Sequence, residues 1–549
     1  FGSMLGCSLQ SWITELPQWS SSSYRNPMFL LSCFLLGLAA CLATDSRTCP
    51  TDFDSASSFL QLQANARRAN ATSSLQTSLE QHLARAQSFC EDNLWLTLKT
   101  CVQPLDDETT YVVTGDIDAM WIRDSSAQMH PYIAIAKREE QENGQSKLRP
   151  LLEGTLRRQA QFMLTDPYAN AFTTDWDSVA DDRLGRGAYV FTDNYELDSG
   201  AYFFKFLARL SDAFPDTAVL HEQPVKDATR MLIALYRQEQ KHAAGQSEYR
   251  YPKWEPFELL GDDGRGLPVA ETGMVWGAFR PSDDRQSYGY NVPGNIFLAA
   301  TLKPIRRIAR QIWKDPELAH AAWELRDSII KGVRKYGTTR RADGEVIYCY
   351  EVDGLGACSV EDDANVPSLL SLPYLDPSAE TFNHRIYKAT RKIILSDENP
   401  WFFQGRAGHG IGSMHTGSRA IWPLSLVMQA MTAESDVERH AVFETLTKAG
   451  MLSNTRGLTE SFDADEPGEV TRPWFGWPNS LLAEHLLSQD RCQPPLSFLD
   501  QLFNDMTGPL QTRPAPRLPE WKEEDTFYGV DPARLRRKDV TLPKLDFYP

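Results

Sequence analysis

Apolar residues recur at spacings of three and four along most of the chain, which is the pattern of amphipathic helices. The segments that carry this pattern are 73–100, 151–164, 198–214, 225–242, 294–315, 317–337, 378–394, 418–432 and 438–451. Strand-like alternation is scarce, and its best example, 344–353, predicts a hairpin. The pattern therefore predicts an all-α fold with small β-hairpin insertions. We expect the helical hairpins to close into an (α/α) barrel; a helical repeat array is the alternative, but no repeat of about 30 to 50 residues is found.

The two ends of the chain differ from this helical part. Residues 28–43, "MFLLSCFLLGLAACLA", form an apolar run followed by small and polar residues, which indicates a signal peptide or, less well, a signal anchor. Residues 1–27 are polar and are interpreted as an upstream segment outside the fold. Residues 511–549 are rich in proline and charge and predict a tail. The catalytic or binding domain is therefore expected within 44–510.

The net charge restricts the kinds of partner. The chain has 56 Lys and Arg against 73 Asp and Glu, a formal charge of −17, which argues against nucleic acid and against an anionic substrate. The 14 Trp residues suit a protein that stacks flat ligands or sugar rings. A membrane is a partner only if the apolar run is kept as an anchor.

The cysteines indicate an oxidising compartment. Six remain after the apolar run, an even number that suits disulfides: Cys49, Cys90, Cys101, Cys349, Cys358 and Cys492. Proximity in sequence favours the pairs Cys90/Cys101 and Cys349/Cys358, with unpaired buried thiols as the alternative, because pairing is not determined by sequence. The sequon "NAT" at 70–72 agrees with secretion or passage through the secretory pathway.

Five segments gather carboxylates beside aromatics, Gly or Pro: 114–133 ("TGDIDAMWIRDSSAQMHPYI"), 193–203, 277–295, 361–375 and 458–480. The first has no clean helical or strand period, so we expect its backbone to be shaped for a ligand rather than for a helix. Paired carboxylates with aromatic platforms are what hydrolysis of a glycosidic bond requires, one acid for the leaving oxygen and one base or nucleophile. Further Asp, Glu and Arg side chains would hold sugar hydroxyls.

Each candidate also has a structural interpretation. Adjacent acids such as Asp283 and Asp284 are commonly helix caps or solvated surface. Glu460 in "LTESFD" can be a satisfied buried carboxylate, and the acids of "YELDS" can be the first turn of a helix. His409 and His415 lack metal-ligand spacing, so sugar or loop hydrogen bonding is preferred for them, and no zinc or phosphate-loop motif occurs. No cofactor is predicted.

Taken together and in order, the motifs "TGDIDAMWIRDS", "YELDS", "FRPSDD", "DDANVPSLLSLPYL" and "TESFD" followed by "RPWFGWPNS" resemble glycoside hydrolase family 125. The resemblance spans roughly residues 90 to 487. It implies an (α/α)6 barrel, a toroid of six helical hairpins, and an exo-acting α-1,6-mannosidase that inverts the anomeric centre without a metal ion. The implied partners are α-mannoside glycans, such as N-glycans or mannoproteins.

The resemblance also implies roles for residues. It assigns Asp283 or Asp284 as general acid, with Asp283 preferred, and Glu460 as the base that activates water. The ligands implied for the terminal mannose are Asp116, Arg123, Asp124, Glu196 and Asp198. Neighbouring side chains complete the predicted substrate-binding set: Trp121, Arg280, Ser282, His409, His415 and Trp474.

Other functions of the same fold stay open. A calcium-dependent α-1,2-mannosidase would lose activity with a chelator, and a non-catalytic mannoside-binding protein would bind without turnover. Intact Asp283, Asp284 and Glu460 argue against the second. A lyase or epimerase would need a His or Tyr base, and the negative net charge makes a uronate lyase unattractive.

Overall fold

The computed structural model describes residues 55–174, 189–245, 249, 251, 260–450, 457–500 and 503. The chain divides into two compact units, Phe1–Ser73 and Ser74–Pro549, and the candidate site lies in the second. The segments 1–27, 28–43 and 511–549, for which the sequence predicts an upstream segment, a signal and a tail, lie outside the described residues. Within the described part, no helix is both long enough and apolar enough to cross a bilayer.

Helices make up most of the second unit, which confirms the all-α prediction with small β insertions. They are α2 (Ser55–Thr100), α3 (Ile122–Asn143), α4 (Leu148–Thr165), α6 (Leu197–Ala213), α7 (Gln223–Glu239), α8 (Gly261–Gly264), α9 (Val292–Gln311), α10 (Pro316–Tyr336), α11 (Leu372–Leu375), α12 (His384–Ile394), α13 (Pro423–Met431), α14 (Asp436–Thr445) and α15 (Gly476–Ser488).

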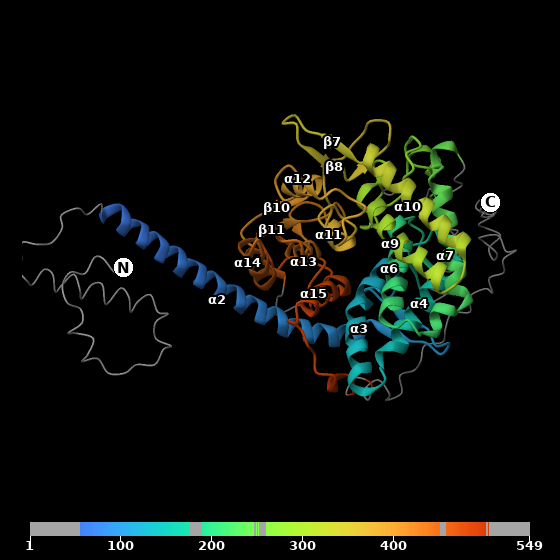
Figure 1. Cartoon of the computed structure of the whole chain (residues 1–549), viewed down its shortest axis with the longest axis horizontal. Coiled ribbons are helices and arrows are strands. Elements are labelled where there is room, and N and C mark those ends of the chain that lie inside the picture. Colours follow the sequence, from blue (N-terminus) through green and yellow to red (C-terminus); the bar gives the residue numbers. More distant parts are fainter. Residues whose placement is uncertain are drawn as a thin grey trace, which may run out of the picture. The chain divides into compact units, whose positions relative to one another are not determined.

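The helices pair as inner and outer members of a ring, as in an (α/α)6 barrel. Helix α3 packs against α6, α6 against α9, α9 against α11, α13 against α15, and α15, the last helix, returns to α3, the first of the ring. Helices α4, α7, α10 and α14 lie outside them and pack on their neighbours in the chain. Figure 1 shows α7 and α10 on one side of this unit, α12 and α14 on the other, and α3, α6 and α15 between them.

The inner elements place the site. Helices α3, α6, α9 and α15 and the short helix α11 each follow directly on a carboxylate-rich segment that the sequence singles out, and α13 follows the Gly-rich segment with His409 and His415. Side-chain contacts join these segments: Arg123 pairs with Glu196 and with Asp283. The segments that carry these residues are therefore brought together.

Several helix starts follow from capping side chains. The Asn291 side chain accepts a hydrogen bond from the backbone N of Gly294 (2.7 Å), and Asp315 accepts one from Leu318 (2.9 Å). Asn383 caps α12 in the same way, so this helix begins at His384 and not at 378 as the apolar pattern predicts.

The expectation that the segment 114–133 avoids helix is wrong for its second half. Helix α3 begins at Ile122, so Arg123 and Asp124 lie in its first turn and only the residues before Trp121 form a loop. The reason is tertiary: α3 packs against α6 and α15, and this packing buries Ile122, Met129 and Ile133.

The strands are short and form six small antiparallel sheets in the described part. The strands are β1 (Val102–Pro104), β2 (Thr110–Val112), β3 (Met120–Trp121), β4 (Ala171–Phe172), β5 (Val190–Thr192), β6 (Tyr290–Asn291), β7 (Thr338–Arg340), β8 (Val346–Tyr348), β9 (Glu351–Val352), β10 (Phe402–Gln404), β11 (His409–Ile411), β12 (Ala420–Ile421), β13 (Ser461–Asp463) and β14 (Val470–Thr471). The predicted hairpin over 344–353 is wrong: its two strands join different sheets, β8 pairing with β7 and β9 with β6.

The disulfides correct one of the two pairings that sequence proximity favours. Cys349 is bonded to Cys358 as expected, but Cys90 is bonded to Cys492, 402 residues away, and Cys101 is a buried free thiol. The distant pair ties α2 to the segment after α15, which the closing of the helical ring brings together. Cys49 lies outside the described residues.

Candidate active site

A single buried guanidinium organises the carboxylates of three inner elements. Arg123, in the first turn of α3, is 3% exposed, and its Nη1 pairs with Glu196 and, at 3.5 Å, with Asp198 Oδ2. Its Nη2 lies 3.5 Å from Asp283 Oδ1, and its Nε lies 3.4 Å from Asp124 Oδ2. Four of the acids that the sequence selects therefore surround one cation, and we call this group the Arg123 cluster.

Burial sets the protonation of the Arg123 cluster. It raises the pKa of Glu196 well above the ordinary range, and it raises the pKa values of Asp124 and Asp198 to about 6, each against the lowering effect of Arg123. The pKa of Asp283 is lowered instead, because hydrogen bonding with Glu196 and the charge of Arg123 outweigh its own burial. The interaction between the two carboxyl groups therefore raises the pKa of Glu196 and lowers that of Asp283.

Neutral donors fix the Asp283 carboxylate further. Its Oδ1 accepts hydrogen bonds from Trp121 Nε1 (3.2 Å) and Asn170 Nδ2 (2.8 Å), and Asn194 Nδ2 donates to its backbone oxygen (3.2 Å). The backbone of Asp283 is left-handed, with φ +66°. Sequence reasoning named Trp121 but missed Asn170 and Asn194, because a single Asn in a loop carries no signal without its partner.

Asp284 points to a different neighbour. Its Oδ2 accepts a hydrogen bond from Ser282 Oγ (2.7 Å), and its Oδ1 lies 3.6 Å from His415 Nδ1. Burial lowers the pKa of His415, but the carboxylates of Asp284, Asp283 and Glu460 outweigh it and raise that pKa to about 9. His415 is therefore cationic at neutral pH, and all three predicted catalytic acids act on it.

Glu460 precedes β13 and is 5% exposed. Its backbone N donates to the carbonyl oxygens of Thr471 and Arg472, and its Oε1 lies 3.6 Å from Arg472 Nη1. Arg472 also donates through Nε to Asp116 Oδ1 (2.9 Å), so it joins Asp116 to Glu460. Sequence reasoning missed Arg472, although "RPWFGW" was singled out, because its two acidic partners come from distant segments.

The loops that carry these groups fit closely. The backbone N of Gly476 donates to Thr114 O (2.8 Å), and Gly115 adopts φ +131°. A Cβ at Gly115 would lie 2.6 Å from the backbone O of Trp474, so only glycine allows this approach. Trp474 itself is 4% exposed, so its side chain is packed where its loop meets the loop of Gly115.

Arg280 is buried rather than open to a ligand. Its Nε donates to Glu351 Oε1 (2.5 Å) and its Nη2 to Glu361 Oε1 (2.8 Å), while Nη1 lies 3.3 Å from Met414 Sδ. Glu351 also accepts from the backbone N of Ser287 (2.8 Å). Arg280 therefore lies between two carboxylates, and its substrate-binding role stays a prediction.

His409 stands apart from these groups. It is exposed on β11, with its ring 6.0 Å from that of Phe402, and no described contact joins it to a carboxylate of the site. Among the described residues, no three His, Cys, Asp or Glu side chains are grouped to hold a metal ion. The centre of the carboxylates is occupied by the guanidinium of Arg123.

A helical ring with carboxylates gathered around a buried Arg123 agrees with the class of helical-barrel glycoside hydrolases. The model of the family "Metal-independent alpha-mannosidase (GH125)" matches residues 80–487. The chain belongs to this family.

Two relatives agree with this assignment. The meiotically up-regulated gene 157 protein of Schizosaccharomyces pombe is 34% identical over 449 residues, which cover 76% of this chain and 84% of the relative. A metal-independent alpha mannosidase of Streptococcus pneumoniae, solved in a non-productive complex with α-1,6-mannobiose, is 34% identical with a TM-score of 0.67; the match covers 75% of this chain and 97% of that one.

Proposed function

We propose that this protein is an exo-acting glycoside hydrolase that removes non-reducing terminal α-1,6-linked mannose with inversion and without a metal ion. Family membership supports an α-mannosidase, and the α-1,6-mannobiose bound by the Streptococcus pneumoniae relative supports the linkage. The observation that carries the proposal is the gathering of Glu196, Asp198 and Asp283 around the buried Arg123, with Asp284 next to them in contact with His415.

The Arg123 cluster supplies the groups that a terminal mannose needs. Its ionised and protonated carboxylates accept and donate hydrogen bonds at fixed positions, which suits the several hydroxyls of one sugar ring. Trp121 lies at its edge, donating to Asp283 and contacting Phe191 edge to face (ring centroids 5.5 Å apart).

Asp284 is the better candidate for the general acid. Asp283 is held ionised by three donors, including Trp121 and Asn170, so it is unsuited to carry a proton and suited to bind a hydroxyl. Asp284 lies outside that group: it accepts a hydrogen bond from Ser282 Oγ and contacts His415. This reverses the preference for Asp283 that the sequence alone suggests.

In the proposed reaction, Glu460 takes a proton from water as the water oxygen bonds to C1 of the mannose. The bond between C1 and the glycosidic oxygen breaks, and that oxygen takes the proton of Asp284. Inversion requires the two carboxyl groups to be about 6.5 to 9.5 Å apart, with room for the water. Arg472, whose Nη1 lies 3.6 Å from Glu460 Oε1, holds the Glu460 carboxylate in place.

The first experiment is hydrolysis of α-1,6-mannobiose beside the 1,2 and 1,3 isomers, with and without EDTA, following the first-formed anomer by NMR. We expect β-mannose from the 1,6 isomer alone, unaffected by EDTA. Loss of activity with EDTA, or a preference for the 1,2 isomer, would instead indicate a calcium-dependent α-1,2-mannosidase. Binding without turnover of any isomer would indicate a mannoside-binding protein.

Variants test the roles. Glu460→Gln should lower kcat by about 100-fold or more while mannobiose still binds, since a general base contributes about 10²–10⁴-fold. Asp284→Asn should lose activity on mannobiose but recover much of it on an aryl mannoside with an acidic leaving group. Asp283→Asn is the matched comparison, and rescue of this variant in place of Asp284→Asn would assign the acid to Asp283.

We also propose that the protein acts on N-glycans or mannoproteins in the secretory pathway or outside the cell. The two disulfides suit an oxidising compartment, and the apolar run 28–43 suits a signal. Fusion of residues 1–60 to a reporter, followed by fractionation, tests the route; a reporter that stays in the cytosol contradicts it.

A further inference from the structure

The segment "EDDANVP", residues 361–367, lies behind the site and contributes no group to the proposed chemistry. Its Asp363 is 1% exposed. Asp363 Oδ1 accepts from the backbone N of Asn365 (2.8 Å) and from its side-chain Nδ2 (2.9 Å). Asp363 Oδ2 accepts a hydrogen bond from Ser413 Oγ (2.6 Å), which lies on the Gly-rich segment before α13. This contact joins two segments 50 residues apart.

Ser413 passes the contact on to His415. The backbone N of His415 donates to Ser413 Oγ (3.2 Å), and His415 Nδ1 lies 3.6 Å from Asp284 Oδ1. The same hydroxyl therefore donates to Asp363 and accepts from His415. The backbone N of Ala364 also donates to Gly412 O (3.0 Å), so the segment holds the chain on the other side of Ser413.

The neighbouring Glu361 holds the opposite loop. Its Oε1 accepts from Arg280 Nη2 (2.8 Å) and its Oε2 from Trp401 Nε1 (2.8 Å). The backbone N of Arg280 in turn donates to Asp284 O (2.7 Å). Two carboxylates of one short segment thus hold the loop of Asp284 and the loop of His415 on either side of their contact.

We propose that Asp363 is a positioning residue for Asp284, acting through Ser413 Oγ to hold the His415 imidazole against the Asp284 carboxylate. The proposal rests on the proposed role of Asp284 as general acid. Asp363 fixes the direction of the Ser413 O–H bond. A lone pair of Ser413 Oγ is then left to accept from the His415 backbone N. Without this bond the segment 413–415 relaxes, and the imidazole loses its contact with the Asp284 carboxylate.

Three carboxylates act on the charge of His415. Asp283 and Asp284 come from the segment before α9, and Glu460 is the residue before β13. The charge of Asp284 also contributes to raising the pKa of Asp363. A displaced His415 therefore loses the carboxylates that raise its pKa, while sugar binding at the Arg123 cluster stays as it was. The expected signature is a fall in kcat and a shifted pH profile with little change in KM.

The test uses Ser413→Ala and Asp363→Asn, singly and together, on α-1,6-mannobiose across pH 4 to 9. Each should lower kcat about 10- to 100-fold, as expected when a reacting group is displaced by about 1 Å, with KM changed by less than about three-fold. One limb of the pH profile should move. The kcat of the double variant should be no lower than that of the less active single variant, because both substitutions remove the same hydrogen bond.

Two controls separate positioning from folding. Asp362→Asn alters an equally buried neighbour, whose carboxylate accepts from the backbone N of Leu369 and Leu370, so it should lower stability without moving the pH profile. Ser413→Thr keeps the hydroxyl and should retain most of kcat. If Asp363→Asn does not fold, the comparison of the Ala and Thr variants of Ser413 decides the proposal.

Two results overturn the proposal. One is a wild-type kcat and pH profile in folded Ser413→Ala; the other is a double variant whose loss is the product of the two single losses. Assaying Asp284→Asn on mannobiose separates failure of the positioning role from failure of the proposed function. Full activity of that variant removes Asp284 from the acid role itself, whereas an inactive Asp284→Asn beside an unchanged Ser413→Ala removes only the positioning role of Asp363.

Discussion

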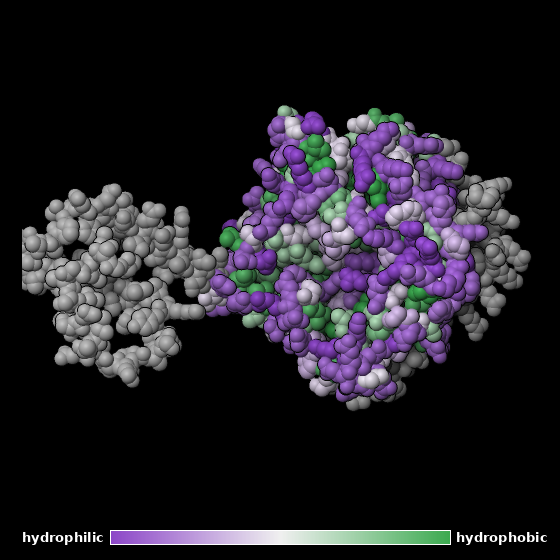
Figure 2. Space-filling model, in the orientation of Figure 1, coloured by the Kyte–Doolittle hydropathy of each residue, from purple (hydrophilic) through white to green (hydrophobic). Residues whose placement is uncertain are grey.

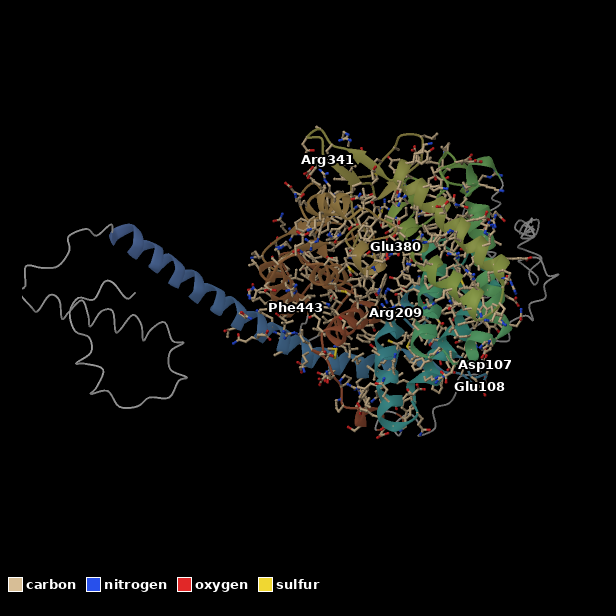
Figure 3. The ribbon with its side chains drawn as sticks, in the orientation of Figure 1. Asp107, Glu108, Arg209, Arg341, Glu380 and Phe443 are labelled. Atoms are coloured by element: carbon tan, nitrogen blue, oxygen red, sulfur yellow. A yellow bond between two sulfur atoms is a disulfide. The ribbon has the colours of Figure 1, made fainter. Side chains whose placement is uncertain are left out.

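Replacing Lys205 by Met should stabilise the protein, although it removes a charged residue from a barrel helix. Lys205, on α6, is 8% exposed, and its Nζ has no hydrogen-bond partner in the described structure. The ammonium lies 3.8 Å from the ring centroid of Tyr374 and 5.9 Å from that of Phe297. Arg209, one turn further along α6, lies near the middle of the face shown in Figure 3. Figure 2 shows that this face is largely hydrophilic.

The size of the effect follows from the pKa. Burial lowers the pKa of Lys205 from 10.5 to about 7, against the attraction of Glu484. A difference of 10.5 − 7 = 3.5 units corresponds to about 5 kcal/mol of unfavourable burial of the charge, at 1.36 kcal/mol per unit. The contact with Tyr374 offsets about 2 kcal/mol of this. Met fills similar space and contacts aromatic rings favourably, so we expect a gain of about 3 kcal/mol at pH 6.

The gain should depend on pH. Because the pKa of Lys205 is lower in the folded than in the unfolded state, the unfolded chain binds one more proton between about pH 7 and 10.5, and the wild type gains stability as pH rises through that window. The variant has no Lys205 proton to lose, so its stability does not rise in this way. Its advantage is therefore full below pH 7 and shrinks toward pH 10.

Denaturation followed by circular dichroism at pH 6, 8 and 10 measures the difference between variant and wild type. Lys303→Met is the matched control: its side chain is 53% exposed on α9 and pairs with Glu380, so we expect a change of about 0.5 kcal/mol at most. A Lys205→Met protein that is less stable than wild type, or whose advantage is the same at pH 6 and 10, would refute the reasoning.

Three further predictions concern the fold. Gly115→Ala should lower activity and melting temperature more than Gly144→Ala, because both glycines have positive φ but only the first would press a Cβ against a neighbouring loop; equal losses would contradict this. Cys90→Ser should destabilise the protein by about 2–4 kcal/mol by opening its bond to the distant Cys492, measured by denaturation against the wild type; an unchanged midpoint would contradict it. Burial lowers the pKa of His485 to about 4, so stability should fall as pH drops from 6.5 to 4, and His485→Phe should flatten that part of the curve measured by thermal melts.

Much of the fold was predictable because helical periodicity is a local property. The nine segments with apolar residues at three and four spacing all contain helices, with ends displaced by several residues where a cap such as Asn383 decides the start. Short strands were less predictable. The residues of 344–353 have a strand-like composition, but whether β8 and β9 pair with each other depends on the segments 290–291 and 338–340 that lie beside them.

The candidate site divides in the same way. Carboxylates among aromatics, as at Asp124, Asp284 and Glu460, stand out in a sequence because such residues are rarely placed together in an apolar setting. Asn170 and Arg472 did not stand out, since an Asn in a loop and an Arg before a Pro are common. Their role exists only through partners 113 and 356 residues away.

The sequence by itself determined the helices, the segments that carry chemistry and the family, since each depends on residues close together in the chain. Only the tertiary structure decided that Arg123 sits among four acids, that Asp283 and Asp284 have different neighbours, and that Cys90 bonds to Cys492. The physical reason is that ion pairs, pKa shifts and disulfides act over a few ångströms, and the closing of the helical ring sets which distant residues come within that range.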